Sequence, residues 1–305
     1  MKKILVATEK PFAPVAVEGI KKIIEESNNE FVLLEKYTDK SELLKAVEDV
    51  NAIIIRSDEV TDEVINAAKN LEIVVRAGAG YNNVDLKSAT DHNVVVMNTP
   101  GQNSNAVAEL ALSMMVYAAR GFFNGKSGGE LKGKKLGIHA FGHVGQIVAT
   151  IAKGFGMKVY AFDPFIPEDI ISEQGVTPCT SVENLYANCQ YISLHIPANE
   201  KTKNSIDYAL LSKMPEGATL INTARKEVIH EANMIKLMKE RADFKYVSDI
   251  APKDSEGFKQ FEGRYFFSPK KMGAQTLEAN VNAGLAAANQ IVKYFETGDE
   301  TFKVN

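Results

Sequence analysis

The chain has 305 residues and a formal net charge of −4, with 45% hydrophobic and 24% charged residues. This is the composition of a globular protein, and its acidic balance argues against a nucleic-acid or anionic-membrane partner. The apolar run after Met1 soon meets Glu9, so it is too short for a signal sequence or a membrane span. The two cysteines, Cys179 and Cys189, fit neither a disulfide framework nor a metal site. A reducing cytoplasmic compartment is expected.

Short runs of β-branched residues alternate with amphipathic stretches in the first third of the chain. Strands are expected at residues 3–7, 31–34, 52–56, 73–76 and 94–97. Helices are expected at residues 15–26, 41–50 and 62–69. Apolar strands joined through helices predict a parallel sheet that is covered on both faces.

Pro100 and Gly101 break this series, and a second one follows. A helix is expected at residues 104–119 and a Gly-rich loop at 121–133. Further strands are expected at residues 135–139, 158–162, 191–195, 219–222 and 246–250, and a last helix at 276–297. The predicted fold class is therefore α/β, with two Rossmann-like lobes that each hold a parallel sheet between helices.

The strand at 135–139 leads into a turn and a helix, which is the context of a dinucleotide-binding fingerprint. Gly142 would let the backbone approach a pyrophosphate, and Gly145 would let the helix pack on the strand. Ala140 occupies the first glycine position, where alanine is acceptable if its φ is negative. An ordinary tight turn is the alternative interpretation. The predicted cofactor contacts of the turn are Phe141, Gly142, His143, Val144 and Gly145.

Asp163 ends the next strand, at the position where an acidic residue meets the adenosine ribose hydroxyls. A carboxylate there repels a 2′-phosphate, and Pro164 and Phe165 follow it in place of an arginine. NAD is therefore favoured over NADP, with Asp163 and Pro164 at the cofactor. Taken alone, Asp163 is equally consistent with a solvated carboxylate at a strand end.

Ordered motifs along nearly the whole chain resemble those of the D-2-hydroxyacid dehydrogenases, and most closely their short phosphoglycerate dehydrogenases without a regulatory tail. The motifs are Arg56-Ser57 with Thr61, residues 76–85 (RAGAGYNNVD), 98–103 (NTPGQN), 107–110 (VAEL), 193–197 (SLHIP), 222–225 (NTAR) and 248–250 (SDI). The resemblance implies a substrate-binding domain at 1–98 plus 276–305 and an NAD-binding domain at 99–275.

The resemblance also implies site residues in the substrate-binding domain. Backbone N–H groups in the loop of Ala77, Gly78, Ala79 and Gly80 would hold the substrate carboxylate, because glycine allows close approach to an anion. Asn103 resembles a family residue that contacts the substrate. Arg56 is the candidate for a substrate phosphate, since a guanidinium holds phosphate in a fixed fork. A surface salt bridge is the alternative role for Arg56.

In the NAD-binding domain, Arg225 resembles the catalytic arginine that binds the carboxylate and polarises the ketone. Asp249 resembles the residue that accepts a hydrogen bond from the nicotinamide carboxamide. His195 and Pro197 resemble a segment that passes under the cofactor, so His195 is interpreted as structural or cofactor-adjacent. Thr223 and Ala224 are assigned to the cofactor site in the same way.

The chain departs from the family where a histidine, oriented by a glutamate, shuttles the proton. The histidine position holds Lys271, or Lys270 in a register shifted by one, and none of the five histidines falls there. A lysine can act as acid and base if burial or a nearby cation lowers its pKa. The alternative is a solvated basic pair. Asp254 stands at the glutamate position and would either pair with the lysine or lie at the surface.

The resemblance predicts NAD-dependent oxidation of 3-phosphoglycerate to 3-phosphohydroxypyruvate, the entry step of serine biosynthesis, in a cytoplasmic homodimer. The enzymatic alternative is a hydroxypyruvate or glyoxylate reductase or another D-2-hydroxyacid dehydrogenase. A non-catalytic NAD-sensing protein is the alternative of another class, because the family histidine is missing.

Overall fold

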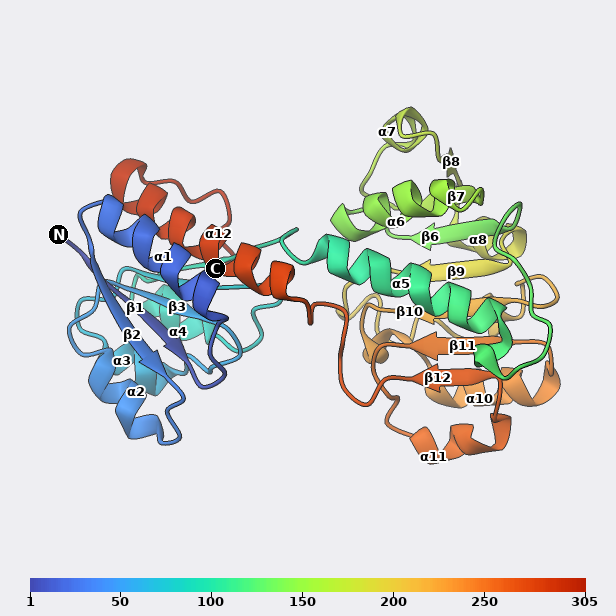
Figure 1. The fold of residues 1–305 in the computed structure, drawn as a ribbon, viewed down its shortest axis with the longest axis horizontal. Helices are drawn as coiled ribbons and strands as arrows, with labels where there is room; N and C mark the ends of the chain where they lie inside the picture. Colours follow the sequence, from blue (N-terminus) through green and yellow to red (C-terminus); the bar gives the residue numbers. More distant parts are fainter. The chain divides into compact units, whose positions relative to one another are not determined.

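The computed structural model describes residues 1–305 and divides them into two compact units (Figure 1). Unit 1 comprises Met1–Asn103 and Gln275–Asn305, and unit 2 comprises Ser104–Ala274. Each unit has its own parallel sheet and its own hydrophobic core. No helix in either unit combines the length and the apolarity that crossing a membrane requires.

Unit 1 is built on a five-stranded parallel sheet in the order β2-β1-β3-β4-β5. Its strands are β1 (Lys3–Thr8), β2 (Glu30–Glu35), β3 (Ala52–Ile55), β4 (Ile73–Arg76) and β5 (Val95–Asn98). Its helices are α1 (Pro14–Glu26), α2 (Lys40–Ala46), α3 (Asp62–Ala67), α4 (Leu86–Asp91) and α12 (Leu277–Thr297). Near the chain end, the Val304 N–H donates to the Val96 carbonyl, which ties the C-terminal residues to β5.

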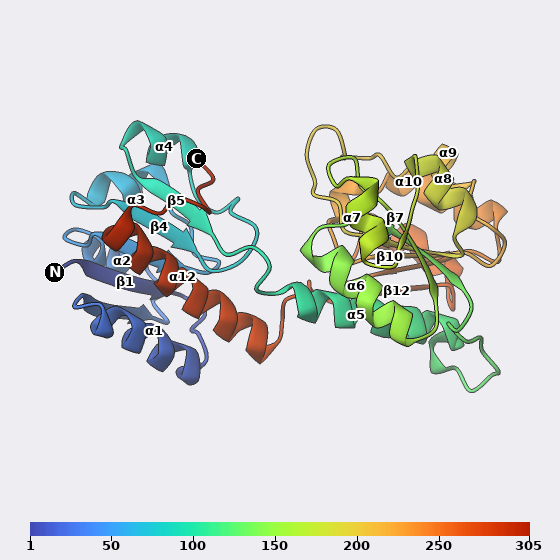
Figure 2. The same ribbon diagram turned by 90° about the horizontal axis from the view of Figure 1, so that it is seen from above.

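Alternate residues of the central strands feed two cores, because successive side chains in a strand point to opposite faces. Leu5 and Ile53 pack in the core under α2, α3 and α4. Ile4 and Ile54 pack in the opposite core under α1 and α12, and the two helical layers flank the sheet in Figure 2. Both faces are covered, which is why these strands are apolar without alternation.

Unit 2 holds a seven-stranded parallel sheet in the order β12-β11-β10-β9-β6-β7-β8. Its strands are β6 (Lys135–His139), β7 (Lys158–Phe162), β8 (Thr177–Pro178), β9 (Tyr191–Leu194), β10 (Thr219–Asn222), β11 (Lys245–Ser248) and β12 (Tyr265–Phe267). Its α-helices are α5 (Ser104–Ala119), α6 (His143–Gly154), α7 (Glu168–Glu173), α8 (Val182–Asn188), α9 (Tyr208–Leu211), α10 (Glu231–Glu240) and α11 (Ser255–Phe258). Three short 3₁₀ helices are η1 (Gly121–Phe123), η2 (Lys226–Val228) and η3 (Lys259–Phe261). The strands after β6 are added first toward β8 and then, from β9, on the opposite side of β6. In α/β folds, ligands bind at the carboxyl ends of the strands beside such a switch point.

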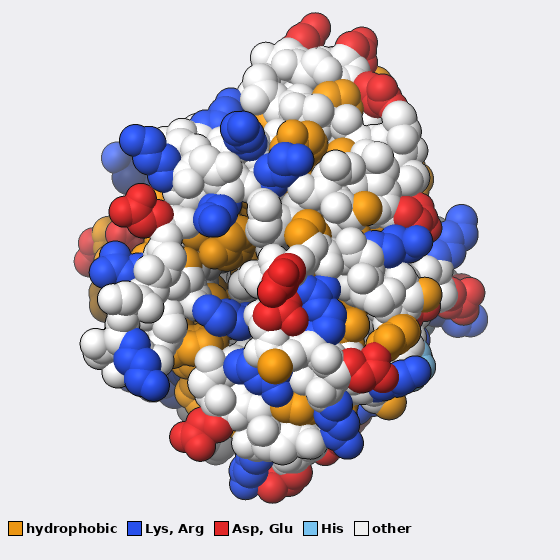
Figure 3. Space-filling view, turned by 90° about the vertical axis from the view of Figure 1, so that its right-hand side faces the viewer, with side chains coloured by type: hydrophobic (Ala, Val, Ile, Leu, Met, Phe, Trp, Pro, Cys, Tyr) orange, Lys and Arg blue, Asp and Glu red, His pale blue; other side chains and the backbone are white.

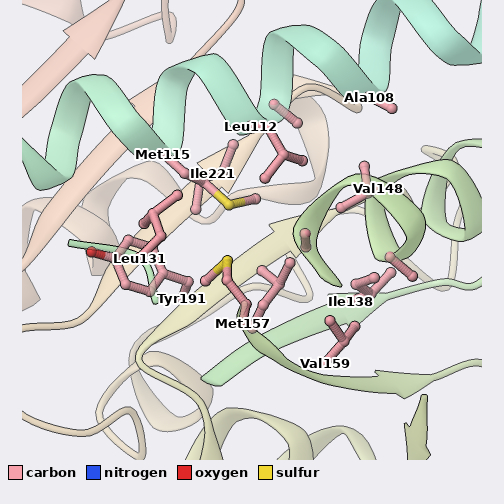
Figure 4. Packing of buried hydrophobic residues seen from close by; sticks show 14 of the residues in the cluster. Ala108, Leu112, Met115, Leu131, Ile138, Val148, Met157, Val159, Tyr191 and Ile221 are labelled. Carbon is pink, nitrogen blue, oxygen red and sulfur yellow. The ribbon is translucent and has the colours of Figure 1, made fainter. Parts of the chain in front are cut away.

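The long helix α5 and the helix α6 pack on one face of this sheet. Figure 4 shows Leu112 and Met115 of α5 directed toward Ile221 of β10 and Tyr191 of β9, and Val148 of α6 lies in the same cluster. The apolar contacts fix α6 against the sheet, and thereby fix the turn that precedes it. Unit 2 presents Lys and Arg interspersed with Asp and Glu on the face seen in Figure 3.

The predicted fold class, two parallel sheets covered by helices, is confirmed. Short elements were not predicted from the sequence, among them α4, β8 and β12. The helix expected at 41–50 begins and ends earlier, because Asp39 caps it in a capping box with Glu42 and Val47 turns inward into the core.

Candidate functional site

The turn between β6 and α6 has the geometry of an anion-binding loop. Gly142 precedes the first residue of α6, and no side chain caps the helix there. A Cβ added to Gly142 would meet no atom within 4 Å, so the approach to the helix N-terminus is open. At Gly145 a Cβ would lie 2.5 Å from the Ala140 carbonyl oxygen, so only glycine allows α6 to start this close to the turn. His143 and Val144 occupy the first turn of this helix.

Ala140 adopts a left-handed conformation with φ of 78°. The expectation that an alanine at this position has a negative φ is therefore wrong. The turn bends the chain from the end of β6 into α6 while the Ala140 N–H donates to the Phe162 carbonyl at 2.9 Å. A glycine at the first fingerprint position avoids the steric cost of this conformation, and an alanine bears about 1 kcal/mol of it.

Asp163 ties the end of β7 to the turn. Its Oδ2 accepts a hydrogen bond from the Phe141 N–H, and its Oδ1 accepts one from the Phe165 N–H, both at 2.8 Å. The Phe141 side chain is fully buried in the core, so the expectation that Phe141 contacts the cofactor needs correction: its amide is engaged by Asp163 and its ring packs inward. Pro164 and Phe165 are exposed.

Two histidines lie beneath the cofactor turn at the ends of β6 and β9. His139 Nδ1 lies 3.2 Å from the Tyr186 hydroxyl, and His195 Nε2 lies 2.9 Å from the Ser193 hydroxyl. Burial lowers the pKa of His139 to about 4, against a smaller opposing effect of Asp163. Burial, reinforced by His139, lowers the pKa of His195 to about 3. Both rings are therefore neutral at pH 7, and Pro197 follows them at the surface.

The turn after β10 presents Arg225. The buried Asn222 side chain accepts a hydrogen bond from the Ala224 N–H and donates one to the Arg225 carbonyl, both at 3.0 Å. Arg225 is exposed, and its Nη1 donates to the Ala224 carbonyl at 3.1 Å. Thr223 is buried and its hydroxyl has no hydrogen-bond partner. Asn222 was not singled out from the sequence, although an Asn that begins a turn is a signal for this side-chain bridge.

Lys271 reaches the same strand ends. Its Nζ donates to the Ala224 carbonyl at 2.5 Å and lies 3.5 Å from Asp249 Oδ1, just after β11. Asp249 is fully buried, and its Oδ2 accepts a hydrogen bond from the Gly273 N–H at 2.9 Å. Burial lowers the pKa of Lys271, and the Arg225 charge lowers it further, against Asp249 and Glu227, which raise it.

The other two acid–base candidates from the sequence, Asp254 and Lys270, do not lie at this cluster of strand ends. Asp254 is exposed and caps α11, where its side chain accepts from the Gly257 N–H, and no contact with Lys271 is formed. Lys270 is exposed as well. Of the acid–base candidates, the structure brings only Lys271 beside Arg225, and it does so with Asp249 as the neighbouring carboxylate.

In unit 1, the loop of Gly78, Ala79 and Gly80 turns its N–H groups away from internal partners. The Gly78 carbonyl accepts from the Thr99 N–H, and the Ala79 carbonyl accepts from the Asn98 side chain. The three N–H groups of this loop donate no hydrogen bond within the unit, as an anion-binding loop requires. Ala77 precedes them in the core, its N–H bonded to the Ile55 carbonyl.

Arg56 makes no salt bridge. Its Nη1 donates to the carbonyls of Lys10 and Pro11 at 3.1 and 2.9 Å, its Nη2 donates to the Asn280 side chain on α12, and its guanidinium lies over the Phe12 ring. These contacts use three of the five N–H donors of a guanidinium. Asn103, partly exposed, is the last residue before α5.

Known proteins resemble this chain over most of its length. The NAD-binding domain model of the D-isomer specific 2-hydroxyacid dehydrogenases matches residues 86–260. A crystal structure of NAD⁺-bound 3-phosphoglycerate dehydrogenase from Entamoeba histolytica is 45% identical, with a TM-score of 0.89 over 100% of this chain and 98% of that one.

Two curated relatives are more distant. Hydroxypyruvate reductase from Thermotoga maritima is 32% identical over 285 residues, which cover 88% of this chain and 92% of that protein. D-3-phosphoglycerate dehydrogenase from Methanocaldococcus jannaschii is 33% identical over 83% of this chain. The chain spans about half the length of that relative, at 51%.

The fold and the matches define the class as an oxidoreductase with an NAD-binding domain. The chain belongs to the D-isomer specific 2-hydroxyacid dehydrogenase family. The family and the cofactor predicted from the sequence are thereby confirmed. The residues fit NAD, because the open start of α6 suits a pyrophosphate and the buried Thr223 hydroxyl has no hydrogen-bond partner within the chain.

Replacing Ala140 with glycine is expected to raise the free energy of unfolding by about 1 kcal/mol, because glycine tolerates the left-handed conformation. The measurement is urea unfolding followed by circular dichroism. Ala187→Gly, at an exposed position in α8, is the matched control and should lower stability by up to about 1 kcal/mol. Equal losses in both variants would show that Ala140 is not strained.

Unfolding should become easier as the pH falls from about 6.5 toward 4. In this range an unfolded histidine binds a proton, whereas His139 and His195, with pKa values of about 4 and about 3, stay neutral in the fold. At pH 5 each residue is expected to remove on the order of 2 kcal/mol of the stability present above pH 6.5. Urea midpoints between pH 7.5 and 5 measure this slope. His139→Leu should flatten it, and an unchanged slope would refute the assignment.

Proposed function

We propose that this protein catalyses the NAD-dependent oxidation of 3-phosphoglycerate to 3-phosphohydroxypyruvate, the reaction that leads into serine biosynthesis. The observation that carries the chemistry is Lys271, a half-buried amine held at the carboxyl ends of β10 and β11 beside Arg225. The substrate assignment is supported by the 45% identity to the phosphoglycerate dehydrogenase of E. histolytica.

In this proposal the C2–H bond of the hydroxy acid breaks and the C2 hydroxyl loses its proton to Lys271. The hydride would pass to NAD, which the turn before α6 would hold. Lys271 acts as base only in its neutral form, and burial, which lowers its pKa, increases the share of this form. In the reverse direction its ammonium returns the proton to the ketone oxygen. Arg225 would bind the substrate carboxylate and stabilise negative charge on that oxygen.

Unit 1 supplies groups for the substrate's anionic ends in this proposal. The unengaged N–H groups of Gly78, Ala79 and Gly80 would bind the carboxylate. Asn103 is a further candidate for a substrate contact, by resemblance to the family. Arg56 would bind the phosphate through the donors it does not use internally, since its contacts with Lys10, Pro11 and Asn280 fix the guanidinium in place. Preformed donors lower the entropy lost on binding.

A hydroxypyruvate reductase is the second candidate. It is favoured by the T. maritima protein of that name, of which this chain covers 92%. The two reactions share hydride transfer at C2 and differ in the phosphate of the substrate, so Arg56 is the residue whose role separates them.

We also propose a cytoplasmic homodimer. The cytoplasmic assignment is supported by two buried cysteines without a disulfide. The dimer is supported only by resemblance to the family, and sedimentation equilibrium of the purified chain tests it directly.

Substrate profiling tests the reaction. NADH oxidation by the wild type is measured with 3-phosphohydroxypyruvate, hydroxypyruvate and glyoxylate. The expected order places the phosphorylated substrate at least 10-fold ahead in kcat/KM, because charge-assisted hydrogen bonds from Arg56 to the phosphate would favour it and a factor of 10 corresponds to about 1.4 kcal/mol. A higher kcat/KM for hydroxypyruvate would favour the reductase. Bound NADH without turnover on any 2-keto acid would favour an NAD-sensing protein.

Lys271→Ala is expected to lower kcat by a factor of about 10² to 10⁴, the usual contribution of a general acid–base group. NADH affinity, measured by fluorescence titration, should change little. Lys270→Ala is the matched comparison, and it should retain most of the activity because Lys270 is exposed. A loss confined to Lys270→Ala would move the acid–base role to the other register.

A further inference from the structure

We propose that Asp249 is the positioning residue for Lys271: its carboxylate holds the segment of residues 271–273 and orients the Lys271 amine beside Arg225. The inference rests on the proposed function and names the carboxylate that completes its acid–base pair. By sequence position, Asp254 is the other candidate for this role.

The two carboxylate oxygens of Asp249 have different partners. Oδ2 accepts a hydrogen bond from the Gly273 N–H at 2.9 Å, and Oδ1 faces Lys271 Nζ at 3.5 Å. Asp249 is fully buried, and an ionised carboxylate stays buried only when it is paired or hydrogen-bonded. Lys271 is the one cation whose ion pair with it closes within 4 Å.

Gly273 has no space for a side chain. A Cβ added there would lie 2.9 Å from Asp249 Oδ2 and 3.2 Å from Val107 Cγ2. The segment therefore rests directly on the carboxylate, and the backbone of Lys271, two residues earlier, is fixed by the same contact. Lys271 Nζ is held from the other side by the Ala224 carbonyl, at 2.5 Å.

Every charged group near the amine then has a defined effect. Asp249 and Glu227 favour the ammonium form, whereas Arg225 and burial favour the neutral amine. The net effect lowers the pKa of Lys271. Of the two groups that raise the pKa of Lys271, Asp249 has the larger effect. Without the Asp249 charge, the pKa of Lys271 should fall further and the amine should lose its orientation.

Asp254 has a different environment. It is exposed, its side chain caps α11 through the Gly257 N–H, and its own N–H donates to Glu231. A carboxylate committed to a helix N-terminus at the surface has no means of orienting a lysine that it does not contact.

The test compares Asp249→Asn with Asp254→Asn. Competitive labelling with acetic anhydride across pH, read by peptide mass spectrometry, gives the titration midpoint of Lys271 without any need for turnover. Asp249→Asn is expected to lower this midpoint by about one pH unit or more, the effect of losing an opposite charge at this distance. Asp254→Asn should leave it in place. An unmoved midpoint in Asp249→Asn, or a shift in Asp254→Asn, would overturn the proposal.

A second readout links the pair to the reaction. The pH dependence of kcat should contain a transition that is absent in Lys271→Ala. In Asp249→Asn this transition should move to the same extent as the labelling midpoint. A merely structural loss would lower kcat without moving the transition. If Asp249→Asn does not fold, Gly273→Ala provides the same test, because its Cβ displaces the carboxylate. If the wild type shows no turnover but Asp249→Asn still shifts the titration midpoint of Lys271, the proposed function is rejected and the pairing of Asp249 with Lys271 is retained.

Discussion

Parallel pairing of every strand in unit 2 is the constraint on which the site depends. It gathers the residues that follow β6, β7, β9, β10 and β11 at one edge of a single sheet. The glycine turn, Asp163, His195, Arg225 and Asp249 all lie just beyond these strand ends. Because the strands are held by backbone hydrogen bonds and by apolar layers on both faces, each turn can adopt an unusual conformation without loosening its neighbours.

The turns themselves are held by hydrogen bonds from side chains to the backbone rather than by regular structure. Asp163 takes up two backbone N–H groups, and Asn222 bridges Ala224 and Arg225. The contacts of Asn222 satisfy polar groups of a buried side chain that would otherwise be costly to bury. The Thr223 hydroxyl is an exception, since it is buried without a hydrogen bond at the same edge of the sheet. Such groups are stabilised when a ligand supplies the missing partner.

The acid–base group proposed for this chain, a lysine, differs in its electrostatics from the histidine that the family resemblance predicts. A histidine titrates near neutrality without assistance, whereas a lysine must be destabilised as a cation. Burial beside Arg225 supplies this destabilisation, and Asp249 limits it. The carboxylate that contacts Lys271 is Asp249, whereas Asp254, five residues further along the chain, caps α11.

The sequence by itself determined the α/β class, the strand–turn–helix unit around Gly142 and Gly145, and the family, because apolar periodicity and glycine spacing are local properties. It also predicted Arg225 as a site residue, and Lys271, or Lys270 in a register shifted by one, as the acid–base group. Only the tertiary structure decided the conformation of Ala140, the burial of Phe141 and the choice of Asp249 over Asp254 as the neighbour of Lys271. Those outcomes depend on which strand ends and loops meet in space, and residues distant in the chain carry no local signal of that contact.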